Sequence, residues 1–278
     1  MQRRDDGHRA CLVDAHVHIR DAAGLETVRA AGVTAVRDAG MRQNAGQGLP
    51  QHGSNAGGLL VIRSGWALYK RGGYGSFFGA AVETREELHH EILKLRDAGA
   101  DIIKVAASGM VSLKTPGAVT PGGFSQDELQ FIVEEAGRLG KGVMAHANGE
   151  PAILAAARAG VRSVEHGFFM TRRALEAMAK QGVFWTPTVG ALARAAETGV
   201  ASGEMKAYID ALIVSHIGMI RHAHGIGVPL AIGTDSVLPD AAYKAAYDAE
   251  LGYFGQAGLS REAVTTIACE SGARLLGI

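Results

Sequence analysis

The chain contains little cysteine and no excess of charge of either sign. Cys11 and Cys269 are the only cysteines among 278 residues, and their spacing forms no C-x-x-C motif. Two cysteines cannot build a disulfide framework, so we expect free thiols in a reducing, cytoplasmic compartment. Basic and acidic residues number 28 each, and no basic run carries interleaved aromatic residues. This composition argues against nucleic acid or an anionic membrane as a partner.

The sequence also lacks long hydrophobic runs. No stretch approaches about 20 uninterrupted apolar residues, the length of a membrane-spanning helix. The stretch 1–18 mixes basic and acidic side chains and has no apolar segment typical of a signal peptide. We therefore expect a soluble protein that is not exported.

What the sequence does contain is a repeated alternation of short strand-like runs with longer helical runs, joined mostly at glycine. Hydrophobic residues make up 47% and charged residues 20%, which is ordinary globular composition. The predicted strands cover residues 11–18, 32–40, 59–65, 100–109, 142–149, 160–167, 182–188 and 228–236. The predicted helices cover residues 24–32, 84–99, 125–140, 151–160, 172–182 and about 204–225, with two more after the last strand.

This alternation predicts an α/β protein with the (β/α)8 TIM-barrel fold, as a single domain over residues 1–278. A doubly wound open sheet is the competing architecture. The glycine cluster GGYGSFFG at residues 72–79 does not favour it, because the cluster lacks the strand, G-x-G-x-x-G and helix of a dinucleotide site. Two longer segments, residues 45–58 and 110–123, follow strand ends and are candidate lid or substrate loops, although ordinary surface loops would look the same.

The motif VDAHVH, residues 13–18, places Asp14, His16 and His18 at alternate positions of the first strand. Alternate side chains of a strand share one face, so the two imidazoles are expected to lie close enough to bind one metal ion. Other strands end in polar residues as well, and in a barrel all of these ends meet at one mouth. The strand-end candidates are His16, His18, Lys104, His146, His166 and Asp235.

Each candidate also has a structural interpretation. Two histidines at a strand end are often only solvated, and a lone strand histidine such as His146 or His166 is commonly a hydrogen-bonded core residue. Asp235 in the sequence GTDS could cap the following turn. Lys104 could form a salt bridge inside the strand DIIKVAAS. A chance origin for the whole set of six is nevertheless hard to accept.

Lys104 has the most specific chemistry of the six. Burial within an apolar strand disfavours its ammonium form and lowers its pKa. An uncharged lysine amine can react with carbon dioxide to form a carbamate. Such a group would be a two-oxygen anion able to bridge two metal ions.

The ordered motifs VDAHVH, IIKVAASG, AHANG, VEHG and IGTDS resemble those of the amidohydrolase superfamily of metal-dependent hydrolases. The resemblance is greatest to imidazolonepropionase-like enzymes and to Xaa-Pro or Xaa-Arg dipeptidases with a carboxylated lysine, and it extends over nearly the whole chain. It implies two divalent metal ions with the following ligands: His16, His18 and Asp235 for one ion, His146 and His166 for the other, and carboxylated Lys104 with a hydroxide as bridges. Imidazole and carboxylate ligands suit zinc, although manganese, cobalt or iron remain possible.

The chain departs from the family in one respect. Family members usually build a small β-sandwich from segments on either side of the barrel, whereas only about ten residues precede the first strand here. The sandwich is therefore expected to be largely absent. We hypothesise that a homo-oligomer contact covers the exposed face.

The resemblance implies hydrolysis of a carbon–nitrogen bond. Two metal ions would lower the pKa of a bridging water to ~7 and polarise the scissile carbonyl. Asp235 would accept the proton of this water and pass it to the leaving nitrogen, acting first as a general base and then as a general acid.

The expected substrate is a small amide, either a dipeptide or an N-acyl amino acid. Four cationic or titratable residues are candidates to bind its carboxylate, although a surface role is the simpler interpretation of each. These residues are Lys70, Arg71, Lys114 and His222. Two alternatives stay open: a mononuclear deaminase or cyclic-amidine hydrolase of the same superfamily, and a catalytically idle metal-binding barrel.

Overall fold

The computed structural model describes residues 12–41, 57–197 and 203–278, and within these ranges the strands pair in parallel. They form two sheets with the orders β10-β1-β2-β3 and β5-β4-β6-β7-β8-β9. The strands are β1 (Leu12–Ile19), β2 (Val33–Asp38), β3 (Leu60–Arg63), β4 (Ala67–Lys70), β5 (Gly79–Val82), β6 (Ile103–Ala106), β7 (Val143–Ala147), β8 (Ser163–His166), β9 (Phe184–Thr186) and β10 (Ser236–Leu238).

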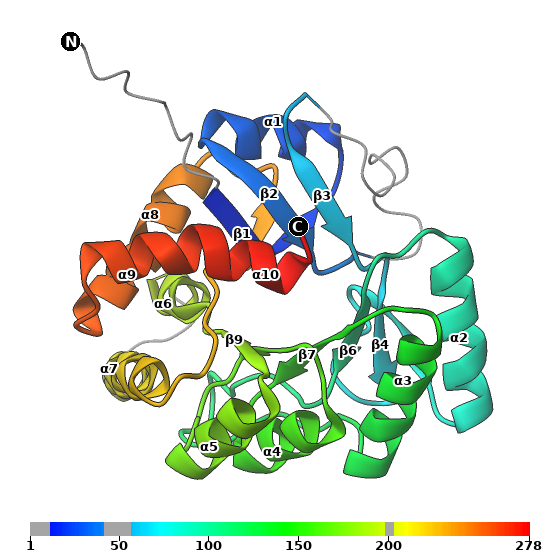
Figure 1. Cartoon of the computed structure of the whole chain (residues 1–278). Helices are drawn as coiled ribbons and strands as arrows, with labels where there is room; N and C mark the ends of the chain where they lie inside the picture. Colours follow the sequence, from blue (N-terminus) through cyan, green and yellow to red (C-terminus); the bar gives the residue numbers. More distant parts are fainter. Residues whose placement is uncertain (1–11, 42–56, 198–202) are drawn as a thin grey trace.

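Backbone hydrogen bonds connect the two sheets at both of their junctions. At one junction, the segment 229–235 lies between β9 and β1: Trp185 N donates to Pro229 O (2.9 Å), and Ala15 N donates to Ile232 O (2.8 Å). At the other, Asp101 N, just before β6, donates to Arg63 O of β3 (2.7 Å). The result is the TIM-like barrel that the sequence predicted, with the strands in a central ring and the helices outside it (Figure 1).

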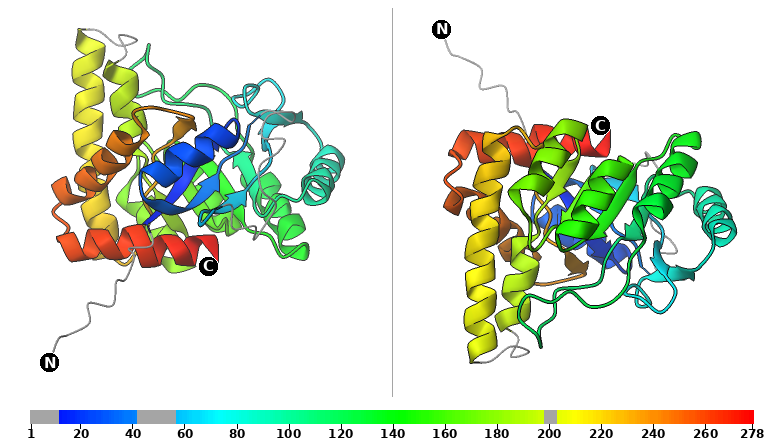
Figure 2. Two further views of the ribbon diagram at one scale, coloured as in Figure 1. Left: turned by 90° about the horizontal axis from the view of Figure 1, so that it is seen from above. Right: turned by 90° about the horizontal axis from the view of Figure 1, so that it is seen from below.

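The helices form the outer layer of the molecule (Figures 1 and 2). They are α1 (Ala22–Ala30), α2 (Arg85–Asp97), α3 (Gln126–Arg138), α4 (Glu150–Ala159), α5 (Arg172–Gln181), α6 (Val189–Glu197), α7 (Glu204–Gly225), α8 (Tyr243–Gln256), α9 (Arg261–Thr266) and α10 (Gly272–Leu276), with a π-helical turn at Ile267–Ser271 between the last two. Ser125 and Glu128 form the predicted capping box at the start of α3. No described helix combines the length and the apolar character needed to span a membrane.

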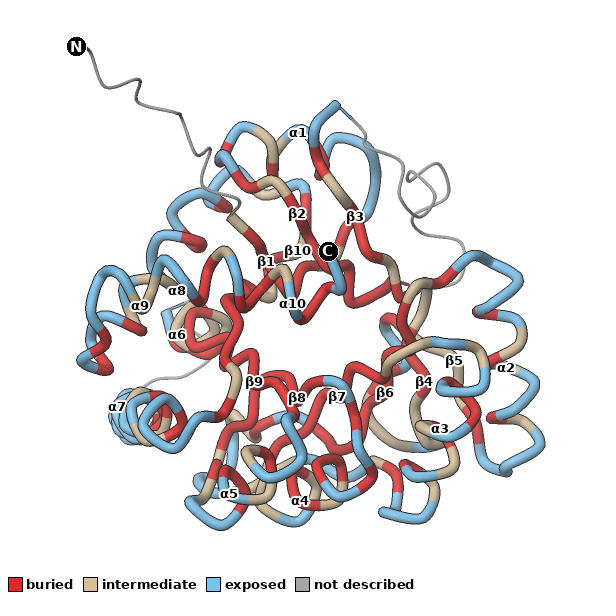
Figure 3. The backbone as a smooth tube through the Cα atoms, viewed as in Figure 1, coloured by how far each residue is buried: buried red, intermediate tan, exposed pale blue. Residues whose placement is uncertain are grey.

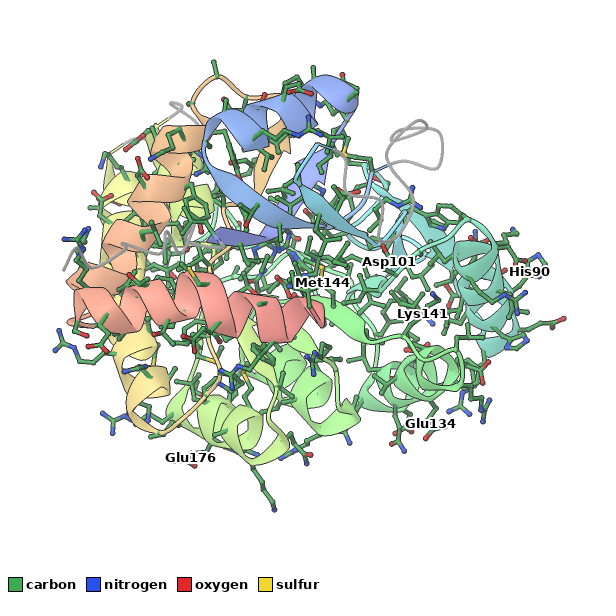
Figure 4. The ribbon with its side chains drawn as sticks, turned by 45° about the horizontal axis from the view of Figure 1, so that its top comes forward. His90, Asp101, Glu134, Lys141, Met144 and Glu176 are labelled. Carbon is green, nitrogen blue, oxygen red and sulfur yellow. The ribbon has the colours of Figure 1, made fainter. Side chains whose placement is uncertain are left out.

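Two hydrophobic layers surround the strands. The larger one packs between the strands and the outer helices, and its buried ring is visible in Figure 3. The smaller one fills the amino-terminal end of the barrel, where Val13 and Met144 pack with Leu275 and Leu276 of α10. Figure 4 shows Met144 in the interior and Glu134 on the outer surface. Because α10 covers this end, the carboxyl ends of the strands form the open end of the barrel.

The structure differs from the sequence prediction in a few elements. The third predicted strand ends at Arg63, and two strands that were not predicted, β4 and β5, follow it in the other sheet. Helix α6 was not predicted, although its alanine-rich sequence has high helix propensity. The eighth predicted strand is irregular, and regular pairing with β1 resumes only at Ser236. Cys11 and most of the segment 45–58 lie outside the described residues.

Candidate metal centre

All six predicted residues line one cavity of about 150 Å³ at the carboxyl ends of the strands. They come from five segments of the ring, so the closed arrangement of strands brings them together. The six are His16 and His18 of β1, Lys104 of β6, His146 of β7, His166 of β8 and Asp235 just before β10.

Asp235 lies at the centre of this group. Its Oδ1 is 3.4 Å from Nε2 of His16 and 3.3 Å from Nε2 of His18, and its Oδ2 is 3.9 Å from Nδ1 of His166. Ligand atoms of His16, His166 and Asp235 all lie within 4.8 Å of one another, a spacing suited to a shared metal ion. The donors are imidazole and carboxylate, which fit zinc and similar divalent ions.

The two histidines of β1 are both held by Nδ1. His16 donates from Nδ1 to the carboxylate of Glu165 (2.9 Å), and His18 donates from Nδ1 to the backbone carbonyl of Gly40 (2.6 Å). Each bond fixes the tautomer and the ring orientation, and leaves Nε2 facing Asp235. This anchoring of one ring nitrogen is typical of histidines that bind metal through the other.

The histidines of β7 and β8 follow the same principle. His146 donates from Nε2 to the carbonyl of Gly109 (3.0 Å), which leaves its Nδ1 for a ligand. His166 is bound through Nδ1 to Oγ1 of Thr188 (2.7 Å), which leaves its Nε2. The two rings lie close together, with centroids 4.6 Å apart. They therefore form a second pair of nitrogen donors beside the first.

A buried ion pair supports His16 from within the barrel. Glu165 binds His16 with one carboxylate oxygen and accepts from Nη2 of Arg37 (2.8 Å) with the other. Arg37 also donates to Ser163 Oγ (2.8 Å) and to Ala15 O (2.7 Å), and its side chain is fully buried. Burial alone would raise the pKa of Glu165, but Arg37 and His16 lower it to about 2. The carboxylate is thus ionised and fixed in place.

Lys104 is buried and its Nζ has no hydrogen-bond partner among the described residues. Burial lowers its pKa to about 8, against the opposing effect of Glu165 and Asp235. A buried amine without a partner is costly unless another group completes the site. The surroundings of Lys104 therefore fit a carbamate bound to metal, and they lack the direct salt bridge that would be its simplest structural explanation.

The buried histidines His16, His146 and His166 are uncharged at neutral pH. Burial, with the nearby Lys104, lowers the pKa of His16 to about 4 and that of His146 to about 3. The neutral ring is the form that binds a metal ion. Burial would raise the pKa of Asp235, but the surrounding histidines, first His16, hold it well below its usual range. The cavity thus presents three uncharged imidazoles beside an ionised carboxylate. His18 differs from them: burial would lower its pKa, but its contact with Asp235 raises it above the usual value.

The backbone at the ligands adopts conformations that a sequence does not reveal. His166 and Asp235 have positive φ values of 66° and 53°, which are uncommon for residues other than glycine. Gly233 allows the segment before Asp235 to approach β1, since a Cβ there would lie 2.9 Å from Cβ of His16. Gly167 allows the chain next to His166 to lie against Trp185, because a Cβ at this position would lie 2.6 Å from Nε1 of Trp185.

Asp14 does not share a face with His16, and that part of the alternation argument is wrong. The register of β1 against β2 shifts between Asp14 and Val17, so strict alternation is interrupted. Asp14 instead accepts from the hydroxyl groups of Thr234 (2.8 Å) and of Tyr243 in α8 (3.1 Å). Its function is to hold the residue before Asp235.

The four candidates for binding a substrate carboxylate lie away from the cavity. Lys70 pairs with Glu128 and Arg71 with Glu87. Lys114 is exposed, and neither it nor His222 of α7 lines the cavity. The loop 110–123 does line it through Met110, Val111 and Leu113, as expected of a substrate loop.

Sequence analysis did not identify the groups that orient the ligands. Arg37 and Glu165 lie within predicted strands. A charged residue inside a buried strand must have a partner, so these two positions could have been identified as a buried charge pair. Thr188 and Tyr74 carried no such signal. Tyr74 lines the cavity with its ring over His146, at a centroid distance of 4.9 Å. Burial raises the pKa of Tyr74 well above its usual value, so the phenol stays protonated.

Comparison with known proteins agrees with this geometry. A model of the amidohydrolase family matches residues 10–278. The ochratoxinase of Aspergillus niger is 34% identical over 159 residues, which are 54% of this chain and 32% of that protein. This chain therefore aligns with about a third of the length of its curated relative.

Solved structures share the fold over almost the whole chain. A Xaa-Pro dipeptidase with methionine in its active site has a TM-score of 0.79 at 23% identity, covering 96% of this chain and 75% of that one. The crystal structure of A. niger ochratoxinase has a TM-score of 0.76 at 23% identity, covering 95% and 71%.

Replacing Glu165 with glutamine should weaken metal binding by about 10- to 100-fold, because a neutral amide no longer fixes His16 or neutralises Arg37. A competitive chelator titration with zinc measures this. Glu134→Gln, on the outer face of α3, is the matched control and should bind zinc like the wild type. Equal affinities in the two variants would contradict the orienting function of Glu165.

The stability of the metal-free protein should depend on the protonation of His146. Its pKa is about 3 in the folded chain and 6.5 ordinarily, so between these values the unfolded chain binds a proton that the folded chain does not. The free energy of unfolding should therefore fall as the pH drops from about 6.5, and should fall less steeply in His146→Gln. Urea unfolding of chelator-treated protein from pH 7 to 4 tests this. The exposed His90→Gln is the control, and equal slopes for His146→Gln and wild type would refute the prediction.

Proposed function

Because the chain belongs to the amidohydrolase family, we propose that it hydrolyses a small amide or peptide bond with the help of two divalent metal ions. The observation that carries this proposal is the convergence of all six strand-end side chains on one cavity. We propose that residues 1–278 act together as a single catalytic domain.

The donors divide into two groups. His16, His18 and Asp235 would hold one ion, since the Nε2 atoms of both histidines face the same carboxylate oxygen. His146 and His166 would hold the other through the ring nitrogens that their protein partners leave unused. Zinc is the ion we expect, with manganese, cobalt or iron as possible substitutes.

Lys104, as a carbamate, would add an oxygen ligand to each of the two groups of donors. Its Nζ is buried without a partner, and its lowered pKa provides a neutral amine near pH 8. Reaction with carbon dioxide forms a nitrogen–carbon bond and releases one proton. The product replaces a buried cation by an anion, which suits a cavity that gathers metal ions.

When bound, the metal ions would supply water of lowered pKa and polarise the scissile carbonyl. Asp235 is ionised and lies at the centre of the cluster, so its carboxylate can accept a proton from the attacking water. The same carboxyl group can then donate this proton to the leaving nitrogen. Asp14 and Thr234 keep it in position through the hydrogen bonds described above.

The names of the similar proteins favour an amide substrate built from an amino acid. One is an ochratoxinase, one a Xaa-Pro dipeptidase. We propose a dipeptide or an N-acyl amino acid as the substrate class. Cytoplasmic location and a homo-oligomeric state stay predictions.

Asp235→Asn should lower kcat by about 100-fold or more while the protein keeps most of its metal, because the amide cannot transfer the proton. Turnover of an amide substrate and elemental analysis of the same sample test this. Asp127→Asn, an exposed change in the first turn of α3, should leave both unchanged. Wild-type activity in Asp235→Asn would rule out the assigned role.

Lys104→Ala should reduce the metal content from two equivalents per chain, because the carbamate that joins the two groups of donors is lost. Elemental analysis of protein purified without chelator gives the count. The exposed Lys180→Ala is the control and should retain two equivalents. One equivalent in the wild type, unaffected by Lys104→Ala, would favour the mononuclear deaminase instead.

A further inference from the structure

The cavity has two chemically different halves. The metal-binding side chains form one half, and apolar side chains form the other. The apolar half comes from three separate segments: Met110, Val111 and Leu113 of the loop after β6, Phe168 after β8, and Leu192 of α6. We refer to these five residues as the apolar wall.

The apolar wall has a small hydrophobic core of its own. Val111, Phe168 and Leu192 pack with Ile209 and Leu212 of α7 in a cluster distinct from the two layers of the barrel. The wall is therefore supported from behind by α7. Its packing does not depend on a bound molecule.

The loop that carries three of the five wall residues is fixed by hydrogen bonds. Val111 and Val119 form an antiparallel bridge, and Thr120 N donates to Met110 O (2.8 Å). Gly117 N donates to the hydroxyl of Tyr208 in α7 (2.6 Å), which ties the tip of the loop to the helix. The loop is thus held as a preformed surface beside the metal centre.

The wall continues outward to the surface of the molecule. Met110, which begins the loop after β6, is 40% exposed. Phe78 extends the apolar lining on the other side of the cavity, beside His18, at a ring-centroid distance of 5.7 Å. Among the described lining residues, Lys104 and Asp235 are the only Lys, Arg, Asp or Glu side chains, and both belong to the metal centre.

We infer that the substrate carries a bulky uncharged apolar group, aromatic or branched aliphatic, that packs against the apolar wall while its amide reaches the metal-binding side chains. This inference rests on the proposed function for the reacting end of the substrate. Burial against the wall would supply binding energy remote from the reacting bond. Each buried methylene is expected to raise affinity about fourfold.

A series of alkylphosphonates tests the inference without requiring turnover. The phosphonate group is an anion that should bind the metal ions. The alkyl chain should pack against the apolar wall, so the change of Kd with chain length measures that contact. Isothermal titration of the metal-loaded protein should show Kd falling about 60-fold from methyl- to butylphosphonate and about 15-fold from butyl- to hexylphosphonate, when every added methylene is buried. Equal Kd values across the series would overturn the inference.

Two variants locate the effect. Leu113→Gln places an amide in the wall at a partly exposed position, and should remove most of the dependence on chain length while methylphosphonate binds as before. Val214→Gln is the control, because Val214 of α7 is 71% exposed and does not line the cavity. In this variant Kd should depend on chain length as it does in the wild type. A full chain-length dependence in Leu113→Gln would also overturn the inference.

A parallel hydrolysis screen separates the two proposals. The screen compares N-acetyl and N-hexanoyl derivatives of one amino acid, and the same acyl group on glycine and on phenylalanine. If the phosphonates discriminate by size but no amide is cleaved, the proposed function fails and the inference stands. If amides are cleaved but neither series depends on apolar size, the function stands and the inference fails.

Discussion

The buried carboxylate of Glu165 is the interaction on which the centre depends. It binds Arg37 of β2 with one oxygen and His16 of β1 with the other, so a residue of β8 links three strands across the barrel interior. An arginine and a glutamate this deeply buried are tolerated only when each satisfies the other. The pair fixes the tautomer of His16 and holds its ring in place beneath the cavity.

Strained backbone surrounds this rigid base. Among the described non-glycine residues, His166, Phe169, Thr188 and Asp235 have positive φ values, and three of these four belong to the centre or orient a ligand of it. Such conformations cost about 1–3 kcal/mol each and persist only where neighbouring groups hold them. Here Trp185 Nε1 binds the carbonyl of His166 (2.9 Å), and Asp14 holds Thr234 beside Asp235. Contacts within the protein thus hold His166 and Asp235 in these conformations.

The residues that line the cavity were easier to predict than the groups that hold them. The barrel could be predicted because parallel strands, buried on both faces, give clear apolar runs joined by glycine. The meeting of the six candidate ligands in one cavity could be predicted because polar residues at the ends of such runs are conspicuous. Three features could not be predicted, because each depends on contacts between distant segments. They are the bulge near Asp14, the irregular segment before Asp235 and helix α6. The sequence shows Arg37 and Glu165 as charged residues inside two predicted strands, but it does not show that they bind each other or that Glu165 binds His16.

The separate core behind the apolar wall has a consequence for the dynamics of the protein. Because Val111, Phe168 and Leu192 pack with α7 in their own cluster, this region can open as a local unfolding unit while the barrel stays folded. The free energy of such an opening is set by a few apolar contacts and by the bond between Gly117 and Tyr208.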